Sequence, residues 1–115
     1  MRKAINPPNA PSAIGTYNQG IESDSLVFTS GQVGIDPSTG QLVGGGIDMQ
    51  AAQTLKNIEV ILASVDLGKE SIVKLTVFVK NLDDFPSVNK AFENFFNGID
   101  YPCLLYTSPS PRDLD

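Results

Sequence analysis

The sequence predicts an α+β fold in which one mixed β-sheet carries two helices packed on a single face. Two stretches, starting near residues 48 and 81, repeat apolar side chains at the three- and four-residue steps of an amphipathic helix. Strand-like stretches lie before and between them. The order strand, strand, strand, helix, strand, helix is typical of helices layered on one side of a sheet, and 115 residues suffice for one domain.

The first strands are predicted as two hairpins. Residues 16–21 and 26–33 flank the polar cluster Glu22–Ser25, a pattern that favours an antiparallel pair. Asp36–Gly40 forms a second turn, because Pro37 presets a turn dihedral and Gly40 tolerates a positive φ. Residues 33–35 and 41–43 are therefore expected to pair across it.

The first helix is expected to follow a glycine-rich linker. Gly44–Gly46 lacks the Gly-Lys-Ser/Thr ending of a phosphate-binding loop, which favours a flexible connection over a phosphate site. Asp48 is a suitable N-cap, and Gly68 is a suitable end. The predicted buried stripe consists of Ala51, Ala52, Leu55, Ile58, Ile61, Leu62 and Val65.

A fourth long strand and a second helix are predicted next. From Glu70 to Lys80 the apolar side chains alternate, with Val73, Leu75, Val77 and Val79 on one face. Phe78 lies on the other face, as a subunit contact or as a singly exposed aromatic. Asn81–Asp84 begins the helix, and the pair Asp83 and Asp84 is interpreted as helix capping in preference to metal or acid–base chemistry. Its expected buried stripe is Phe85, Val88, Phe92, Phe95 and Phe96.

Composition excludes several classes of site. The chain has 8 basic and 13 acidic residues, a net charge of −5, and this disfavours binding to a nucleic-acid backbone. The absence of histidine excludes a Ser-His-Asp triad and any histidine-ligated metal site. The single cysteine, Cys103, excludes an internal disulfide and is not assigned as a nucleophile. No stretch approaches the ~18 apolar residues of a membrane span, so we expect a cytoplasmic protein without a membrane partner.

Several segments together resemble one known family. They are Ile14–Gly20, Val27–Gln32, the side chains Gln53 and Asn57, and Thr76–Val79. Over residues 6–102 the chain resembles the RidA/YjgF family of small enamine and imine deaminases, whose members are also labelled endoribonuclease L-PSP or translation initiation inhibitor. The resemblance implies a chorismate-mutase-like fold, a homotrimer, and a cleft between subunits. There, without a cofactor, 2-imino or 2-enamino acids such as 2-iminopropanoate and 2-aminoacrylate are hydrolysed to 2-oxo acids and ammonia.

Four substrate-binding residues follow from the same resemblance. Tyr17 is expected to line the cleft with its phenol, Ser30 and the Gly31 amide to contact the substrate, and Asn89 to border it from the second helix. Ser30 and Gly31 end an apolar strand with a bare backbone, which exposes main-chain donors. Each residue also has a structural interpretation: Tyr17 caps a sheet edge, Ser30–Gly31 forms a bulge, and Asn89 lies on a solvated helix face.

The sequence departs from the family pattern after Pro102. Family members carry an arginine where this chain has Leu104, and a guanidinium is the natural clamp for a substrate carboxylate. We therefore expect a RidA-like domain over residues 1–102 and a non-native tail without strand periodicity over residues 103–115. The resemblance implies that the family's closing strands are missing from this chain. The glutamate that orients the attacking water in the family lies on one of those strands and is missing with them. Arg112 is no substitute for the clamp. No catalytic residue is assigned, and the chain is expected to be weakly active or inactive.

Two other functions remain open at the level of sequence. If Leu104 is genuine, a non-catalytic trimer that binds a small ligand becomes the leading interpretation. A single-strand ribonuclease or translation inhibitor ranks third, because the net charge and the lack of histidine disfavour it.

Overall fold

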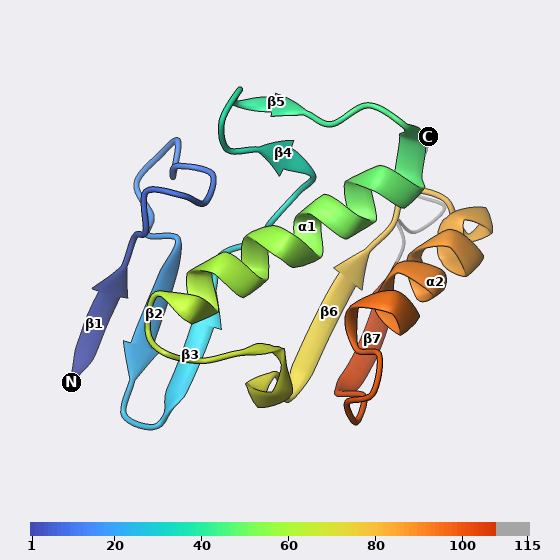
Figure 1. Ribbon diagram of the computed structural model, residues 1–115. Coiled ribbons are helices and arrows are strands. Elements are labelled where there is room, and N and C mark those ends of the chain that lie inside the picture. Colours follow the sequence, from blue (N-terminus) through green and yellow to red (C-terminus); the bar gives the residue numbers. More distant parts are fainter. Residues whose placement is uncertain (108–115) are drawn as a thin grey trace.

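A computed structural model describes residues 1–107 and confirms the α+β class, with both helices on the same side of the strands (Figure 1). Nine elements make up this part of the chain. They are β1 (Arg2–Ile5), β2 (Gly20–Ser23), β3 (Leu26–Thr29), β4 (Ile35–Asp36), β5 (Gln41–Leu42), α1 (Gly46–Ala63), β6 (Lys74–Phe78), α2 (Phe85–Phe95) and β7 (Cys103–Thr107). Short 3₁₀ turns, Lys69–Ser71 and Leu82–Asp84, precede β6 and α2.

The first hairpin is confirmed, but its strands are shorter than predicted. β2 and β3 pair antiparallel, with Ser23 opposite Leu26 across a turn at Asp24 and Ser25. Asp24 adopts a positive φ of 54°, a conformation that aspartate tolerates in tight turns. β1 adds to the outer edge of β2 and was not predicted, because Arg2–Ala4 are polar or small and only Ile5 is buried.

The second hairpin is confirmed as well. β4 and β5 pair with Ile35 opposite Leu42. Asp36 closes the turn, since its Oδ1 accepts hydrogen bonds from the Ser38 hydroxyl at 2.7 Å and the Ser38 amide at 2.9 Å. These two bonds to Ser38 stabilise the carboxylate and lower the pKa of Asp36.

Helix α1 differs from its predicted bounds at both ends. It begins at Gly46 after Gly45, which has a φ of 95° that glycine adopts without strain. Asp48 lies inside the first turn and caps nothing, although its charge suits the positive end of the helix. The helix ends at Ala63, before the expected Gly68, and the Leu67 amide donates back to the Leu62 carbonyl at 3.0 Å.

The predicted alternation is confirmed over β6, but the strand is shorter than the expected Glu70–Lys80. Residues Lys69–Ser71 form a 3₁₀ turn, and Val73, which was placed on the covered face, lies before the strand and is 72% exposed. Leu75 and Val77 are half-buried, while Phe78 is 81% exposed on the opposite face. The side chain of Asn81, and neither aspartate, caps the turn before α2 by accepting from the Asp83 amide at 2.9 Å.

The buried stripe of α2 is narrower than predicted. Val88 and Phe92 are buried, together with Phe96 just after the helix. Phe95 is only half-buried, and Phe85 at the start of the helix is 41% exposed.

The expectation that the chain forms no strand after Pro102 was wrong for residues 103–107. They form β7, which runs parallel to β6 with Lys74 opposite Cys103 and Phe78 opposite Thr107. Leu104 and Leu105 point to opposite faces and Tyr106 packs under α2, so the segment is apolar on both faces and lacks a simple alternation. The rest of the expected tail, including Arg112, lies outside the described residues.

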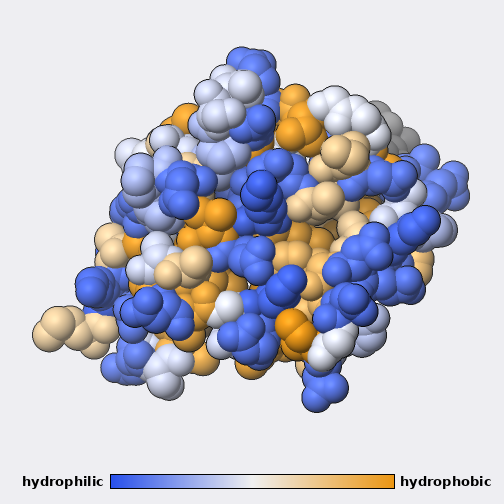
Figure 2. Space-filling view, in the orientation of Figure 1, coloured by the Kyte–Doolittle hydropathy of each residue, from blue (hydrophilic) through white to orange (hydrophobic). Residues whose placement is uncertain are grey.

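Two separate apolar clusters lie beneath the helices. The larger joins Leu55 of α1 to Val79, Val88, Phe92 and Phe96, and the smaller joins Ile61 of α1 to Ile5 and Ala10. In the orientation of Figure 1, hydrophilic side chains cover the outer faces of the helices, and a strip of hydrophobic surface lies between them (Figure 2). None of the helices within residues 1–107 is long and apolar enough to cross a membrane.

Candidate functional site

The loop that carries Tyr17 is held by a buried glutamine. Gln19 is 3% exposed, and its Nε2 donates to the carbonyls of Pro11 and, at 3.2 Å, Ala10. Its backbone amide donates to Asn6 Oδ1 at 2.9 Å, while Asn6 Nδ2 donates to Asn18 Oδ1 at 2.9 Å. These bonds join Asn6, which follows β1, to Asn18 and Gln19, which precede β2, and thereby close the loop between the two strands.

Three of the four predicted site residues lie in adjoining segments. The Ser30 hydroxyl donates to the Asn18 carbonyl, and the Ser30 amide donates to the Gln19 carbonyl at 2.9 Å. The end of β3 is thereby joined to the segment that begins with Tyr17. Tyr17 is exposed, and its Oη accepts from the Ile14 amide at 3.2 Å. Gly31 is exposed, with open space where a side chain would stand.

The chain beyond Gly31 is positioned by a buried asparagine of α1. Asn57 is 1% exposed, and its Nδ2 donates to the carbonyls of Ile35 at 2.9 Å and Val33 at 3.2 Å. Its Oδ1 accepts from Gln53 Nε2 at 2.8 Å. The sequence had marked Gln53 and Asn57 only as part of a resemblance. Their polar side chains on the buried side of a helix are the signal that could have identified a supporting role.

The fourth predicted residue lies elsewhere. Asn89 is half-buried on α2, and its Nδ2 donates to Glu93 Oε1 at 3.2 Å. No hydrogen bond within residues 1–107 links Asn89 to Tyr17, Ser30 or Gly31. A single copy of the chain therefore assembles three of the four predicted residues and leaves the fourth apart.

Leu104, which stands at the expected arginine position, lies in β7. It is opposite Leu75 in the ladder and is partly exposed. Cys103 beside it carries an exposed free thiol. Over residues 1–107, no group of three or more cysteine, aspartate or glutamate side chains is placed to hold a metal ion.

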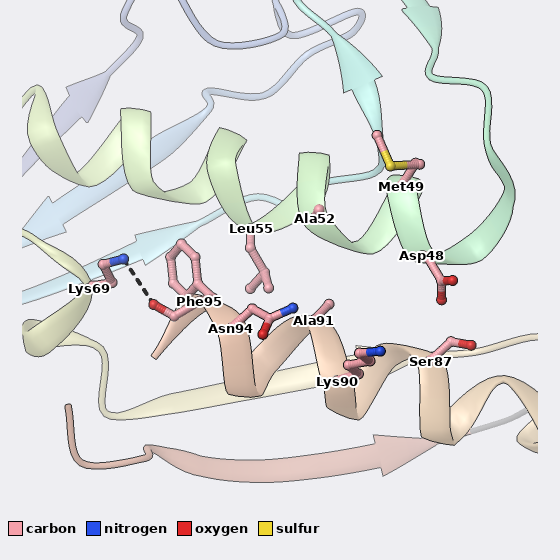
Figure 3. Close-up of a pocket in the computed structure, with 10 residues that line it drawn as sticks. All are labelled: Asp48, Met49, Ala52, Leu55, Lys69, Ser87, Lys90, Ala91, Asn94 and Phe95. Carbon is pink, nitrogen blue, oxygen red and sulfur yellow. Dashed lines mark hydrogen bonds between the residues drawn. The ribbon is translucent and has the colours of Figure 1, made fainter. Parts of the chain in front are cut away.

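A groove of about 490 Å³ lies between α1 and α2 (Figure 3); none of the four predicted residues lines it, although Asn89 precedes the lining residue Lys90 on α2. Its apolar floor includes Leu55 of α1 and Phe95 of α2, and Asp48 and Lys90 lie toward one end. Lys69 at the other end is held in place, because its Nζ donates to the Phe95 carbonyl at 2.9 Å and lies 4.7 Å from the centre of that ring. These residues were interpreted from sequence as helix core, cap and solvated surface, and nothing in their spacing marks a groove.

Tyr106 of β7 is half-buried against α2, and its hydroxyl oxygen is buried. The Tyr106 ring is 4.5 Å from that of Phe85 and 6.5 Å from that of Phe92. Burial raises the pKa of Tyr106, and its Oη has no hydrogen-bond partner among the described residues. Tyr106 therefore packs at the edge of the larger apolar cluster, with a hydroxyl oxygen that no described residue hydrogen-bonds.

Comparison with known proteins connects this geometry to one group. A family model described as Endoribonuclease L-PSP matches residues 7–107. A protein of Salmonella typhimurium, named 2-iminobutanoate/2-iminopropanoate deaminase, is 48% identical over 84% of this chain and 74% of its own length. A mouse protein of the same name is 43% identical over 85% of this chain and 73% of its own length.

The similarity extends to three dimensions. The crystal structure of a protein of unknown function from Yersinia pestis, YyfA of the conserved Rid family, superposes with a TM-score of 0.91. It is 36% identical, and the match covers 98% of this chain and 91% of that one.

Proposed function

Because the chain belongs to the endoribonuclease L-PSP family, also called RidA/YjgF, we propose that its scaffold serves the hydrolytic deamination of small 2-imino and 2-enamino acids. The observation that carries this proposal is the name 2-iminobutanoate/2-iminopropanoate deaminase, borne by relatives that are 43% and 48% identical. The products are a 2-oxo acid and ammonia, and the proposed setting is the cytoplasm.

In this proposal the protein holds and orients the substrate, and water supplies the nucleophile. The Tyr17 phenol, which accepts from the Ile14 amide, keeps its own proton for donation to a ligand. The Ser30 hydroxyl donates its hydrogen to the Asn18 carbonyl. Its oxygen lone pairs are therefore left to accept a hydrogen bond from an imine or enamine N–H. Gly31 leaves its main chain open to close approach. Fixed partners of this kind lower the entropic cost of reaching the attack geometry.

We propose that the missing carboxylate clamp makes this chain a weak enzyme. Leu104 offers no donor, whereas a bidentate guanidinium contributes charge-assisted hydrogen bonds of roughly 1.5–3 kcal/mol each. Freshly generated 2-iminopropanoate, with ammonia release as the readout, is the test. We expect Leu104→Arg to raise kcat/KM by about 10- to 100-fold, and Leu104→Gln, a polar control, to leave it nearly unchanged. Turnover by the unmodified chain equal to that of its deaminase relatives would refute the proposed impairment.

A homotrimer is the second part of the proposal. The sheet face opposite the helices exposes Leu26, Phe28, Phe78 and Leu105, and isolated soluble proteins rarely leave such a patch uncovered. A subunit contact there is also a way to bring Asn89 of one copy toward the Tyr17, Ser30 and Gly31 of another. Sedimentation equilibrium should report three copies, and Phe78→Lys should dissociate them. A monomer at all concentrations would overturn this part.

A non-catalytic ligand-binding trimer is the second candidate function, and the aliphatic side chain at position 104 favours it. It predicts that 2-oxo acids bind the chain while ammonia release stays at background even in Leu104→Arg. The family label of endoribonuclease supports a third candidate. Cleavage of single-stranded RNA by highly purified protein in metal-free buffer would move that candidate to the first place.

The domain boundary is also part of the proposal. We propose that the RidA-like domain covers residues 1–102 and that the sequence departs from the natural one after Pro102, in a segment of which the family model still matches residues 103–107. The intact mass of the natural protein, together with the gene sequence beyond the codon for Pro102, tests this. A natural sequence identical through residue 115 would contradict it.

A further inference from the structure

Of the asparagines in the chain, Asn97 alone precedes a glycine. Asparagine is chemically labile when the main-chain nitrogen of the next residue can reach its side-chain carbonyl carbon. A following glycine permits this approach, because it has no Cβ to obstruct it. At Asn6 the next residue is a proline, which has no amide hydrogen to lose. The sequence therefore singles out Asn97 and Gly98 for a reaction of the main chain with its own side chain.

The turn that contains this pair is fixed at both of its ends. Phe96 is 1% exposed, and its amide donates to the Phe92 carbonyl at 2.9 Å. Its ring packs edge-on against that of Phe95, with the ring centres 4.9 Å apart. On the other side, the Ile99 amide donates back to the Phe96 carbonyl at 2.8 Å. The core and this bond together hold the two residues that flank Asn97 and Gly98.

The reacting groups at the tip of the turn are exposed. Asn97 and Gly98 both face solvent, and no hydrogen bond within residues 1–107 involves the Asn97 side chain or the Gly98 amide. Gly98 adopts a φ of 78°, and a Cβ at this position would meet open space. The Gly98 amide can therefore lose its proton to solvent, and the Asn97 side chain can rotate toward it, without breaking a hydrogen bond among the described residues.

Two other asparagines show the contrast with a helical position. Asn89 precedes Lys90 and Asn94 precedes Phe95, and all four residues lie within α2. Main-chain amides inside a helix donate to the carbonyls of the preceding turn, so an attack by the Lys90 or Phe95 nitrogen would first break that bond. Asn89 and Asn94 are therefore internal references for the behaviour of Asn97.

We propose that Asn97 is a site of spontaneous deamidation and isoaspartate formation. The Gly98 amide loses its proton, and its nitrogen forms a bond to Cγ of Asn97 while the bond from Cγ to the side-chain nitrogen breaks and ammonia leaves. Water then adds to one of the two carbonyls of the resulting cyclic imide. Opening at one carbonyl gives an aspartate, and opening at the other gives an isoaspartate, in which the main chain runs through the former side chain. The only co-reactant is water.

The modification changes the turn that leads from α2 toward β7. Either product adds a negative charge just beyond the C-terminal end of α2, where the helix dipole favours cations and the last turn of the helix has no basic residue. Isoaspartate also lengthens the main chain by one carbon between Phe96 and Ile99. Because Phe96 is anchored in the larger apolar cluster, we expect the added carbon to break the bond from the Ile99 amide to the Phe96 carbonyl.

The test incubates the full, folded chain at neutral and at mildly alkaline pH and follows each asparagine by peptide mapping with mass spectrometry. We expect Asn97 to convert at least tenfold faster than Asn89 and Asn94, at a rate that rises with pH because the attacking amide must lose its proton. Methylation by a protein isoaspartyl methyltransferase should detect isoaspartate at position 97. A synthetic peptide of residues 93–101 gives the rate without the fold, and the folded chain should react within tenfold of it.

Two variants separate the chemistry from its structural effect. Asn97→Gln should show no conversion, because ring closure through one more carbon is much slower. Freshly prepared Asn97→Asp carries the new charge without the added main-chain carbon, so it should keep the hydrogen-exchange protection of the Ile99 amide. The isoaspartyl form should lose that protection at least tenfold, and retained protection would refute the loosening of the turn. Conversion of Asn97 that is no faster than that of Asn89, or more than tenfold slower than in the peptide, would overturn the proposal.

Discussion

Replacement of Asn57 by alanine should loosen the segment that follows Gly31 as well as destabilise the fold. The side chain is 1% exposed and makes three hydrogen bonds, to the Val33 carbonyl at 3.2 Å, the Ile35 carbonyl at 2.9 Å and the Gln53 amide at 2.8 Å. A net contribution of about 1 kcal/mol for each of the three bonds gives a loss of about 3 kcal/mol. Two of the lost bonds hold α1 to Val33 and Ile35, which follow Ser30 and Gly31 in the chain.

Urea unfolding of Asn57→Ala, followed by far-UV circular dichroism, measures the loss in the free energy of unfolding. Gln53→Ala removes one of the three bonds and should cost about 1 kcal/mol. Lys56→Ala, at an exposed position on the same helix, should cost less than about 0.5 kcal/mol. If Asn57→Ala cost no more than Gln53→Ala, the bonds from α1 to the Val33 and Ile35 carbonyls would not have the role assigned to them.

Three further outcomes are expected, each measured by unfolding in urea. Phe96→Ala removes a ring that is 1% exposed and should lower the free energy of unfolding by about 3–5 kcal/mol. Leu82→Ala, at an exposed position, should change it little. Equal losses in the two variants would argue against a core role for Phe96. Gly34→Ala places a methyl group 2.8 Å from main-chain atoms of Gln50 in α1 and should lower the free energy of unfolding by about 1–3 kcal/mol. Gly44→Ala meets open space and is the control. Similar losses in both variants would contradict the close approach of Gly34 to α1. Tyr106→Phe removes a buried hydroxyl without a partner in residues 1–107 and should be neutral or stabilising. Because the folded pKa of Tyr106 is raised above its ordinary value of 10.0, the neutral phenol's contribution to stability is present below pH 10 and is lost as pH rises through the folded pKa. Stability above pH 10 should then fall less steeply in the variant, and parallel pH profiles would refute that assignment.

The accuracy of prediction differed along the chain for physical reasons. The alternation around Leu75 and Val77 identified β6 correctly, because one of its faces packs against helices and the other is exposed. β1 and β7 were missed for opposite reasons. β1 has too few apolar residues to show a period, and β7 is apolar on both faces, so neither has the pattern of a half-covered strand.

The candidate site was predictable only in part. Ser30 and Gly31 stand out locally, since they end an apolar strand with small residues. That Ser30 bonds to the segment beginning with Tyr17, and that Asn57 anchors the residues after Gly31, depends on contacts between residues that are 12 to 24 positions apart. Local pattern carries no information on such pairs.

The amino-acid sequence alone determined the α+β class, both hairpins, the two helices and the family resemblance, because hydrophobic period and turn chemistry act over a few neighbouring residues. The tertiary structure decided the helix ends, the parallel pairing of Cys103–Thr107 with β6 and the division of the core into two clusters. It also decided that Asn89 lies apart from Tyr17 and Ser30. These features depend on which distant segments meet, and that outcome is set by the burial of side chains and main-chain groups across the whole fold.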